Sequence, residues 1–280
     1  MIDELEKQNL IRLATLNDPN AMYELIDVLQ EEKNYDEAFM WASNGSRKGY
    51  PTIERKLGYF YEMGYGTEKD YDKARFYYES AASKNDSNAM LNLGLLYIRG
   101  LGVEKNDQKC FELVKQSADL NNIKALITLA RLYLKGIGTP ISLELYYQTL
   151  KKCYELGDSS VLYSLGMALE NGVGTEVNLK EAFQYFYQGA NEKDTRCYFE
   201  LAKLLTNGDG VEKDYSKAMY WYQLAAKEND PKAMFCLGLY YEKGLYVAAD
   251  LSKALFWYEK ASELGLDKAR EKVQELKNSK

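Results

Sequence analysis

Residue types that commonly carry out catalysis are scarce in this sequence. Its 280 residues include no histidine, which excludes His-dependent catalytic triads, histidine-containing zinc sites and a histidine general base. The 42 Asp and Glu residues could supply an acid–base pair, but no spacing brings two of them into a recognisable cleft. No Gly-x-x-x-x-Gly-Lys-Ser/Thr phosphate-binding loop occurs. We therefore expect no catalytic residues, no metal site and no cofactor.

The four cysteines are widely spaced and form no Cys-x-x-Cys pair. Cys110, Cys153 and Cys197 stand where other copies of an internal repeat carry alanine, so we expect small buried hydrophobic residues. Disulfides or a metal site are the alternatives. Cysteines without an evident pairing are typical of proteins in a reducing compartment. The first residues of the chain are acidic and polar and do not resemble a secretory signal. A cytoplasmic location is therefore expected, unless a targeting segment has been removed.

Glycine pairs could also suggest a ligand-binding loop. Residues 207–214 (Asn-Gly-Asp-Gly-Val-Glu-Lys-Asp) faintly resemble a calcium-binding loop, but the ligand spacing and the terminal glutamate are missing. Glycine adopts left-handed backbone angles without steric cost, so these pairs are interpreted as tight turns that end one helix before the next begins.

The elements around these turns repeat along the chain. Leucine recurs every 36 residues, at Leu57, Leu93, Leu129, Leu165, Leu201 and Leu237. A small residue follows each leucine, which predicts close approach of a partner helix. Good N-cap residues stand before each second helix, at Asp70, Asn106, Ser142, Asn178, Asp214 and Asp250. Self-similarity at one such period indicates stacked helical repeats.

This pattern predicts one continuous domain over residues 1–280. An N-terminal helix covers 1–16, with Ile2, Leu5, Leu13 and Leu16 as buried contacts, and a shortened repeat covers 18–50. Six 36-residue repeats follow over 51–266, and a charged capping helix over 267–280 closes the last hydrophobic face. The repeat at 123–158 is irregular, because Pro140 lies in its turn and Tyr146 replaces the usual alanine.

Charge and hydropathy restrict the partners. The net charge is −6 and the pI is near 5.1, which argues against a nucleic-acid partner because phosphate binding requires a basic footprint. No apolar run approaches the roughly 18 residues expected of a membrane span.

The repeat resembles the Sel-one-like repeat, a relative of the tetratricopeptide repeat. Residues 233–241 read Ala-Met-Phe-Cys-Leu-Gly-Leu-Tyr-Tyr, and 208–226 contain Gly-Asp-Gly-Val, Asp-Tyr-Ser-Lys-Ala, Trp-Tyr and Ala-Ala. The resemblance implies an all-α, right-handed α/α superhelical solenoid of about seven helix-turn-helix repeats, commonly bacterial, that acts as an adaptor or binding scaffold. Some cysteine-rich relatives are described as binding penicillin or hydrolysing β-lactams, but their regular cysteine pairs are missing here.

In related solenoids the first helix of each repeat lines a concave groove. Side chains two before and two after the leucine point away from the second helix. An apolar row and several basic residues fall there or farther along the same helices, and the apolar row could equally pack against the adjacent repeat. The residues expected to bind a protein or peptide are Arg99, Ile127, Arg131, Lys135, Tyr163, Phe199, Lys203 and Phe235.

The function predicted from these features is a non-enzymatic scaffold that binds a protein or peptide on the concave face. A bacterial regulatory adaptor and an immunity protein that neutralises a toxin both fit. The alternatives are an enzyme of the β-lactamase-like or cell-wall-hydrolase type, and a structural solenoid that only associates with itself. The oligomeric state is not predicted.

Overall fold

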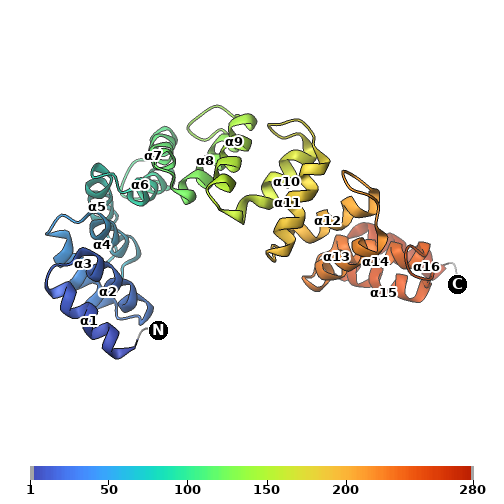
Figure 1. Cartoon of the computed structure of the whole chain (residues 1–280), viewed down its shortest axis with the longest axis horizontal. Coiled ribbons are helices and arrows are strands. Elements are labelled where there is room, and N and C mark those ends of the chain that lie inside the picture. The colour runs from blue at the N-terminus through green and yellow to red at the C-terminus, as the bar shows by residue number, and fades with distance from the viewer. Residues whose placement is uncertain (1–2, 279–280) are drawn as a thin grey trace. The chain divides into compact units, whose positions relative to one another are not determined.

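The structure, a computed structural model, describes residues 3–278, and every regular element within them is a helix (Figure 1). The elements are α1 (Glu4–Thr15), α2 (Pro19–Glu31), α3 (Tyr35–Ser46), α4 (Pro51–Met63), α5 (Tyr71–Ser83), α6 (Ser87–Arg99), α7 (Asp107–Asp119), α8 (Ile123–Lys135), α9 (Leu143–Glu155), the 3-10 helix η1 (Ser159–Val161), α10 (Leu162–Asn171), α11 (Leu179–Asn191), α12 (Arg196–Asn207), α13 (Tyr215–Lys227), α14 (Pro231–Lys243), α15 (Leu251–Glu263) and α16 (Asp267–Asn278).

The helices form two compact units, Met1–Ser142 with α1–α8 and Leu143–Lys280 with α9–α16. Within each unit every helix packs against the next one in sequence, which confirms the all-α class and the repeat architecture. The boundary falls inside the repeat that the sequence marks as irregular. There Tyr146 is half-buried, whereas the equivalent Ala74, Ala182 and Ala218 are fully buried. That one domain spans the whole chain stays a prediction.

The predicted turn chemistry is confirmed at the ends of the helices. Each first helix from α4 onward ends at a glycine in the left-handed conformation: Gly64, Gly100, Gly136, Gly172, Gly208 and Gly244. The side chains of five predicted N-caps accept a hydrogen bond from an amide in the first turn of the following helix, at Asp70, Asn106, Asn178, Asp214 and Asp250. These bonds satisfy amides that the helix itself leaves unpaired.

The conserved spacing of small residues has a packing cause. A Cβ added at Gly58 would lie 2.8 Å from the ring of Tyr78, and one at Gly238 would lie 2.4 Å from the ring of Tyr258. Both tyrosine rings are fully buried between the two helices of their repeat. The predicted close approach of the second helix is therefore confirmed at these positions.

The N-terminal helix corrects one detail of the sequence interpretation. Leu5 and Leu16 are 80% and 70% exposed, while Ala14 is fully buried and Leu13 packs against the first hydrophobic core. α1 packs mainly against α2, so a narrow stripe is buried and these two leucines fall outside it. Ile2 and the ends of the predicted terminal helices, residues 1–2 and 279–280, lie outside the described residues.

The charged helix α16 packs against α15 and buries Ala269, with Val273 and Leu276 half-buried on the same helix. Its remaining side chains are mostly charged, as a capping helix requires. Within residues 3–278, every helix is too short or too polar to span a bilayer.

Candidate partner-binding surface

The first helices of the second unit place three predicted residues in one row. Tyr163, Phe199 and Phe235 lie on α10, α12 and α14 at the same repeat position, and all three are half-buried. Each ring packs against an aromatic ring of the second helix in its own repeat, with centroid distances of 5.3–6.1 Å. One part of each ring is thus fixed by packing while another part remains on the surface. We call this surface of α10, α12 and α14 the first-helix face of the second unit.

Basic side chains from the start of the next first helix lie beside this aromatic row. The Arg196 guanidinium is 5.1 Å from the centroid of the Tyr163 ring, and the Lys232 ammonium is 5.9 Å from that of Phe199. Such distances allow cation–π attraction. Lys268, one repeat further along, lies in the same pocket as Phe235. The sequence interpretation missed these three basic residues, although their own spacing of 36 residues would have revealed them.

Two pockets open on this face. One, of about 410 Å³, is lined by Phe199, Lys232, Phe235, Cys236, Gly265, Leu266, Asp267 and Lys268. The other, of about 280 Å³, is lined by Tyr163, Arg196, Phe199, Glu200, Asp230, Pro231 and Lys232. Because Phe199 and Lys232 line both pockets, the two form a continuous surface.

Lys203, predicted as a free basic contact, is bonded within the protein. Its ammonium lies 2.7 Å from the Glu170 carboxylate and also contacts Glu200. Burial alone would lower the pKa of Lys203, but the hydrogen bonds from its ammonium to these two carboxylates outweigh burial and raise it. Lys203 therefore holds α12 to α10 and offers little free charge to a partner.

The predicted residues of the first unit have mixed environments. The Arg99 guanidinium lies 2.7 Å from the Glu62 carboxylate, and Ile127 is half-buried on α8. Arg131 and Lys135, also on α8, are exposed and make no ion pair with any residue between 3 and 278. Arg131 and Lys135 are thus the predicted residues of this unit whose charges are free to meet a partner.

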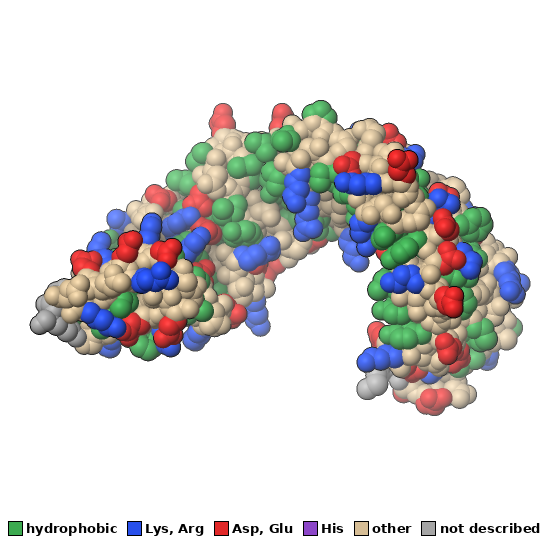
Figure 2. Space-filling view, turned by 180° about the vertical axis from the view of Figure 1, so that it is seen from behind, with side chains coloured by type: hydrophobic (Ala, Val, Ile, Leu, Met, Phe, Trp, Pro, Cys, Tyr) green, Lys and Arg blue, Asp and Glu red, His purple; other side chains and the backbone are tan. Residues whose placement is uncertain are grey.

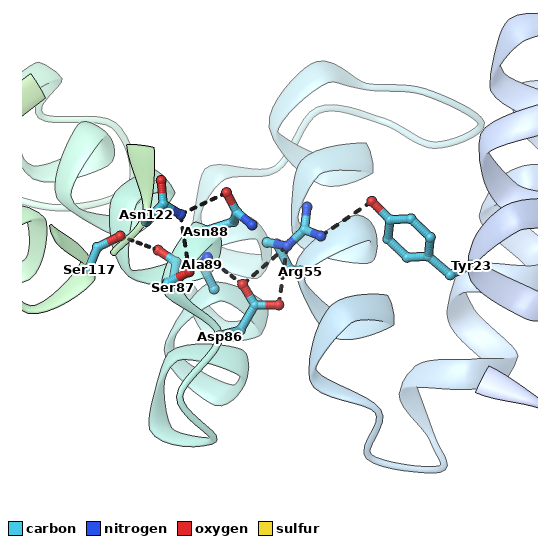
Figure 3. Close-up of polar contacts among 8 residues, drawn as sticks. All are labelled: Tyr23, Arg55, Asp86, Ser87, Asn88, Ala89, Ser117 and Asn122. Atoms are coloured by element: carbon cyan, nitrogen blue, oxygen red, sulfur yellow. Dashed lines mark hydrogen bonds and ion pairs between the residues drawn. The ribbon is translucent and has the colours of Figure 1, made fainter. Parts of the chain in front are cut away.

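A polar network links the first helices of the first unit (Figure 3). Arg55 of α4 donates to the Asp86 carboxylate at 3.2 Å and, more weakly, to the Tyr23 hydroxyl of α2 at 3.5 Å. Asp86 also accepts from the amide of Ala89 at 2.8 Å and so caps α6. Burial alone would lower the pKa of Arg55, and its bonds to Tyr23 and Asp86 outweigh burial and raise it.

The network continues toward α8. The Asn122 side-chain amide donates to Ser87 and Asn88 at 3.1 and 2.9 Å, and the Ser117 hydroxyl donates to the Ser87 carbonyl at 2.6 Å (Figure 3). A polar pocket of about 600 Å³ lies on the same helices, lined by Asp27, Gln30, Glu31, Arg55, Lys56, Tyr59, Asn88, Leu91, Asn92 and Lys124. The first-helix face of this unit, formed by α2, α4, α6 and α8, is thus polar where that of the second unit is aromatic.

The second helices carry a further pocket that the sequence interpretation did not single out. Its volume is about 750 Å³, and its walls include Phe183 and Tyr187 of α11 and Tyr220 and Trp221 of α13. Tyr187 and Tyr220 are half exposed. The position of Tyr220 recurs as exposed Phe76 and Phe256, so periodicity gave a signal there, whereas Tyr187 has no aromatic counterpart at its position in the other repeats.

Charges of both signs are interspersed over the face of the molecule seen in Figure 2. Among the described residues, no three His, Cys, Asp or Glu side chains gather as a metal-ion site would require. Cys110, Cys153 and Cys197 are free and buried, as small hydrophobic residues would be. Burial raises the pKa of the Cys110 and Cys153 thiols to about 11, so both remain protonated near neutral pH.

A family model described as Sel1 repeat matches the sequence in six segments. They cover residues 29–50, 54–86, 87–122, 159–194, 195–230 and 231–266, and leave out the whole irregular repeat at 123–158. None of the curated proteins compared with the chain matches it.

Two solved structures are similar to this chain along most of its length. A protective antigen of uropathogenic Escherichia coli, described as displaying an SLR fold, matches with a TM-score of 0.87 and 26% identity; the match covers 99% of this chain but only 59% of that protein. A Sel1 repeat protein from Oxalobacter formigenes matches with a TM-score of 0.68 and 28% identity, over 86% of this chain and 96% of that protein.

Proposed function

The chain belongs to the Sel1 repeat family, and from this premise we propose that it is a non-enzymatic scaffold that binds a protein or peptide partner through its first-helix faces. Sel1 repeats typically serve protein–protein interaction. The residues proposed to contact the partner are Arg99, Ile127, Arg131, Lys135, Tyr163, Phe199, Lys203 and Phe235, of which Arg99 and Lys203 already pair with carboxylates of the protein.

The observation that carries this proposal is the aromatic row of the second unit. Tyr163, Phe199 and Phe235 line two adjoining pockets while their rings are already held by the second helices. Rigid aromatic side chains lose little conformational entropy on binding and are enriched among the residues that dominate binding energy. On the first unit, the exposed side chain of Arg131 provides a basic contact in addition to these aromatic ones.

A paired-variant capture experiment tests the proposal. The variant Arg131→Ala/Phe199→Ala removes one basic and one aromatic side chain from the first-helix faces. The control Tyr187→Ala/Tyr220→Ala removes two exposed aromatic side chains from the second helices. We expect the first variant to lose partners captured from the native source and the control to retain them, with unchanged circular dichroism for both. Retention by the first variant would contradict the proposal.

Two biological roles fit such a scaffold, a cytoplasmic bacterial regulatory adaptor and an immunity protein that neutralises a toxin. They differ in what the captured partner does by itself. Expression of the partner alone arrests growth in the immunity role, and co-expression of this chain restores growth. In the adaptor role the partner is harmless alone.

The non-enzymatic part of the proposal is tested separately. The sequence contains no histidine, and no motif or spacing in it points to a catalytic nucleophile or acid–base pair. We therefore expect the purified protein to leave a chromogenic β-lactam intact. Turnover above the rate in buffer, at a level that scales with protein concentration, would contradict this expectation.

A further inference from the structure

The first-helix face of the second unit carries positive charges that the protein does not neutralise. Lys232 and Lys268 are exposed, occupy equivalent positions in successive repeats and form no ion pair with any described residue. Lys232 lines both pockets of this face and Lys268 lines the larger one. In a protein of net charge −6, these two lysines place unpaired positive charge beside an aromatic pocket.

The carboxylates near these pockets already have partners. Glu200 contacts the Lys203 ammonium, and Asp230 accepts from the amides of Lys232 and Ala233 at 2.7 and 3.0 Å. Asp267 lies 3.2 Å from the Arg270 guanidinium. Glu200 and Asp267 are thus paired with basic side chains of the protein, whereas Asp230, which accepts only from backbone amides, keeps its charge at the start of α14.

The larger pocket provides an apolar site that both lysines line. Phe199, Phe235 and Leu266 are among its apolar residues, and Lys232, Lys268 and Asp267 are its charged residues. A volume of about 410 Å³ lies within the range of pockets that enclose small organic groups. Carboxylates on a partner would meet the lysines, while an aromatic side chain would lose water-exposed surface in the pocket.

We propose that this surface binds an extended acidic segment of the partner protein, with one aromatic side chain of that segment in the pocket between Phe199 and Phe235. Carboxylates on either side of the aromatic residue pair with Lys232 and Lys268. This inference rests on the proposed scaffold function and assigns the chemical class of the bound segment.

A peptide titration tests the assignment. The probe is a fluorescein-labelled twelve-residue peptide with a central tryptophan flanked by Asp and Glu, and binding to the full-length protein is followed by fluorescence anisotropy. One analogue replaces each Asp and Glu by Asn and Gln, and another replaces the tryptophan by alanine. We expect each analogue to bind at least ten-fold more weakly, and binding to weaken as NaCl rises from 50 to 300 mM.

Charge-matched variants locate the site. Lys232→Glu/Lys268→Glu is expected to weaken the acidic peptide at least ten-fold. Lys180→Glu/Lys227→Glu makes the same charge change at exposed positions on the second helices α11 and α13 and is expected to leave binding within two-fold. Equal weakening by both variants, equal affinity for the amide analogue, or no binding of the acidic peptide at 1 mM protein would overturn the inference.

Partner capture separates this inference from the scaffold function. If Lys232→Glu/Lys268→Glu still captures the partner while Arg131→Ala/Phe199→Ala does not, the acidic-segment assignment fails and the scaffold function stands. If both variants still capture it, both proposals fail. All four lysines are exposed, and the milder variant Lys232→Gln/Lys268→Gln serves in capture and titration if charge reversal disturbs folding.

Discussion

The second glycine of the turns, present in every repeat over 51–266 except the last, where Tyr246 stands, lies where a neighbouring helix leaves little room for a side chain. An added Cβ at Gly66 would lie 2.3 Å from the carbonyl oxygen of Tyr35, and one at Gly174 would lie 1.8 Å from that of Leu143. Gly66 and Gly174 have a positive φ and pack against the first residue of the second helix in the preceding repeat, Tyr35 of α3 and Leu143 of α9. The residue therefore serves the contact between repeats as well as the turn itself.

Gly210 and Gly157 separate these two requirements. Both have positive φ, but a Cβ at Gly210 would lie 2.2 Å from the Leu179 carbonyl carbon, whereas one at Gly157 meets no atom within 4 Å. We expect Gly210→Ala to lower the free energy of unfolding by about 2–4 kcal/mol, from overpacking plus backbone strain. Gly157→Ala should cost only the strain, about 1 kcal/mol. Urea denaturation measures both, and equal losses would contradict the packing explanation.

The Glu242 carboxylate makes stability depend on acidity. The Tyr258 hydroxyl donates to it, and the Lys272 ammonium lies 2.9 Å away. Burial alone would raise the pKa of Glu242, but these two partners outweigh burial and lower it below the usual glutamate value. The resulting stability is present above the unfolded-state pKa, about 4.3, and is lost as pH falls through the lower folded-state pKa.

Replacing this carboxylate should flatten the acid side of the stability profile. We expect Glu242→Gln to lower stability by about 1 kcal/mol or less at pH 7, since the site is partly exposed. The difference from wild type should shrink as pH falls from about 5 to 3. Thermal unfolding at several pH values measures it, with exposed Glu263→Gln as the control. A difference that is constant with pH would show that the carboxylate charge is not responsible.

Helix boundaries could be predicted from the sequence because their signals are local. Left-handed glycines end the first helices from α4 onward, and capping side chains begin most of the helices there, with exceptions that include the starts of α4, α10 and α12. Burial on α1 could not be predicted in the same way, because its packing against α2 decides which stripe is covered. Leu5 and Leu16 lie outside that stripe.

The capping contribution can be measured on α13. The Asp214 side chain accepts from the Lys217 amide at 2.9 Å, and no other side chain bonds this first turn among the described residues. We expect Asp214→Ala to lower the free energy of unfolding by about 1 kcal/mol. Glu212→Ala removes an exposed carboxylate from the same turn without removing a cap and should change stability little. Similar losses for both variants would attribute the effect to charge rather than to capping.

For the whole molecule, the candidate surface could be predicted only in part. The aromatic row followed from the repeat register, because Tyr163, Phe199 and Phe235 share one helical position. That the charge of Lys203 is neutralised could not be predicted from its own position. The neutralising carboxylate, Glu170, comes from the preceding repeat. Lys232 was missed because it stands at the start of a helix, outside the positions counted from the leucine.

The division into two units also lies at the scale of the whole molecule. It falls at Ser142, inside the irregular repeat, and all of that repeat is missing from the family match. Polar contacts tie together the first helices of one unit, and an aromatic row lines those of the other. Each unit therefore presents its own chemistry to a partner.

Site-specific photocrosslinking tests most directly whether the partner binds the first-helix face. A photoreactive phenylalanine analogue replaces Phe199 or Phe235 in one set of variants, and exposed Tyr187 or Tyr220 of the second helices in a matched set, all expressed in the native source. We predict partner adducts from the Phe199 and Phe235 positions and none from Tyr187 and Tyr220. Adducts confined to the second-helix positions would contradict the account.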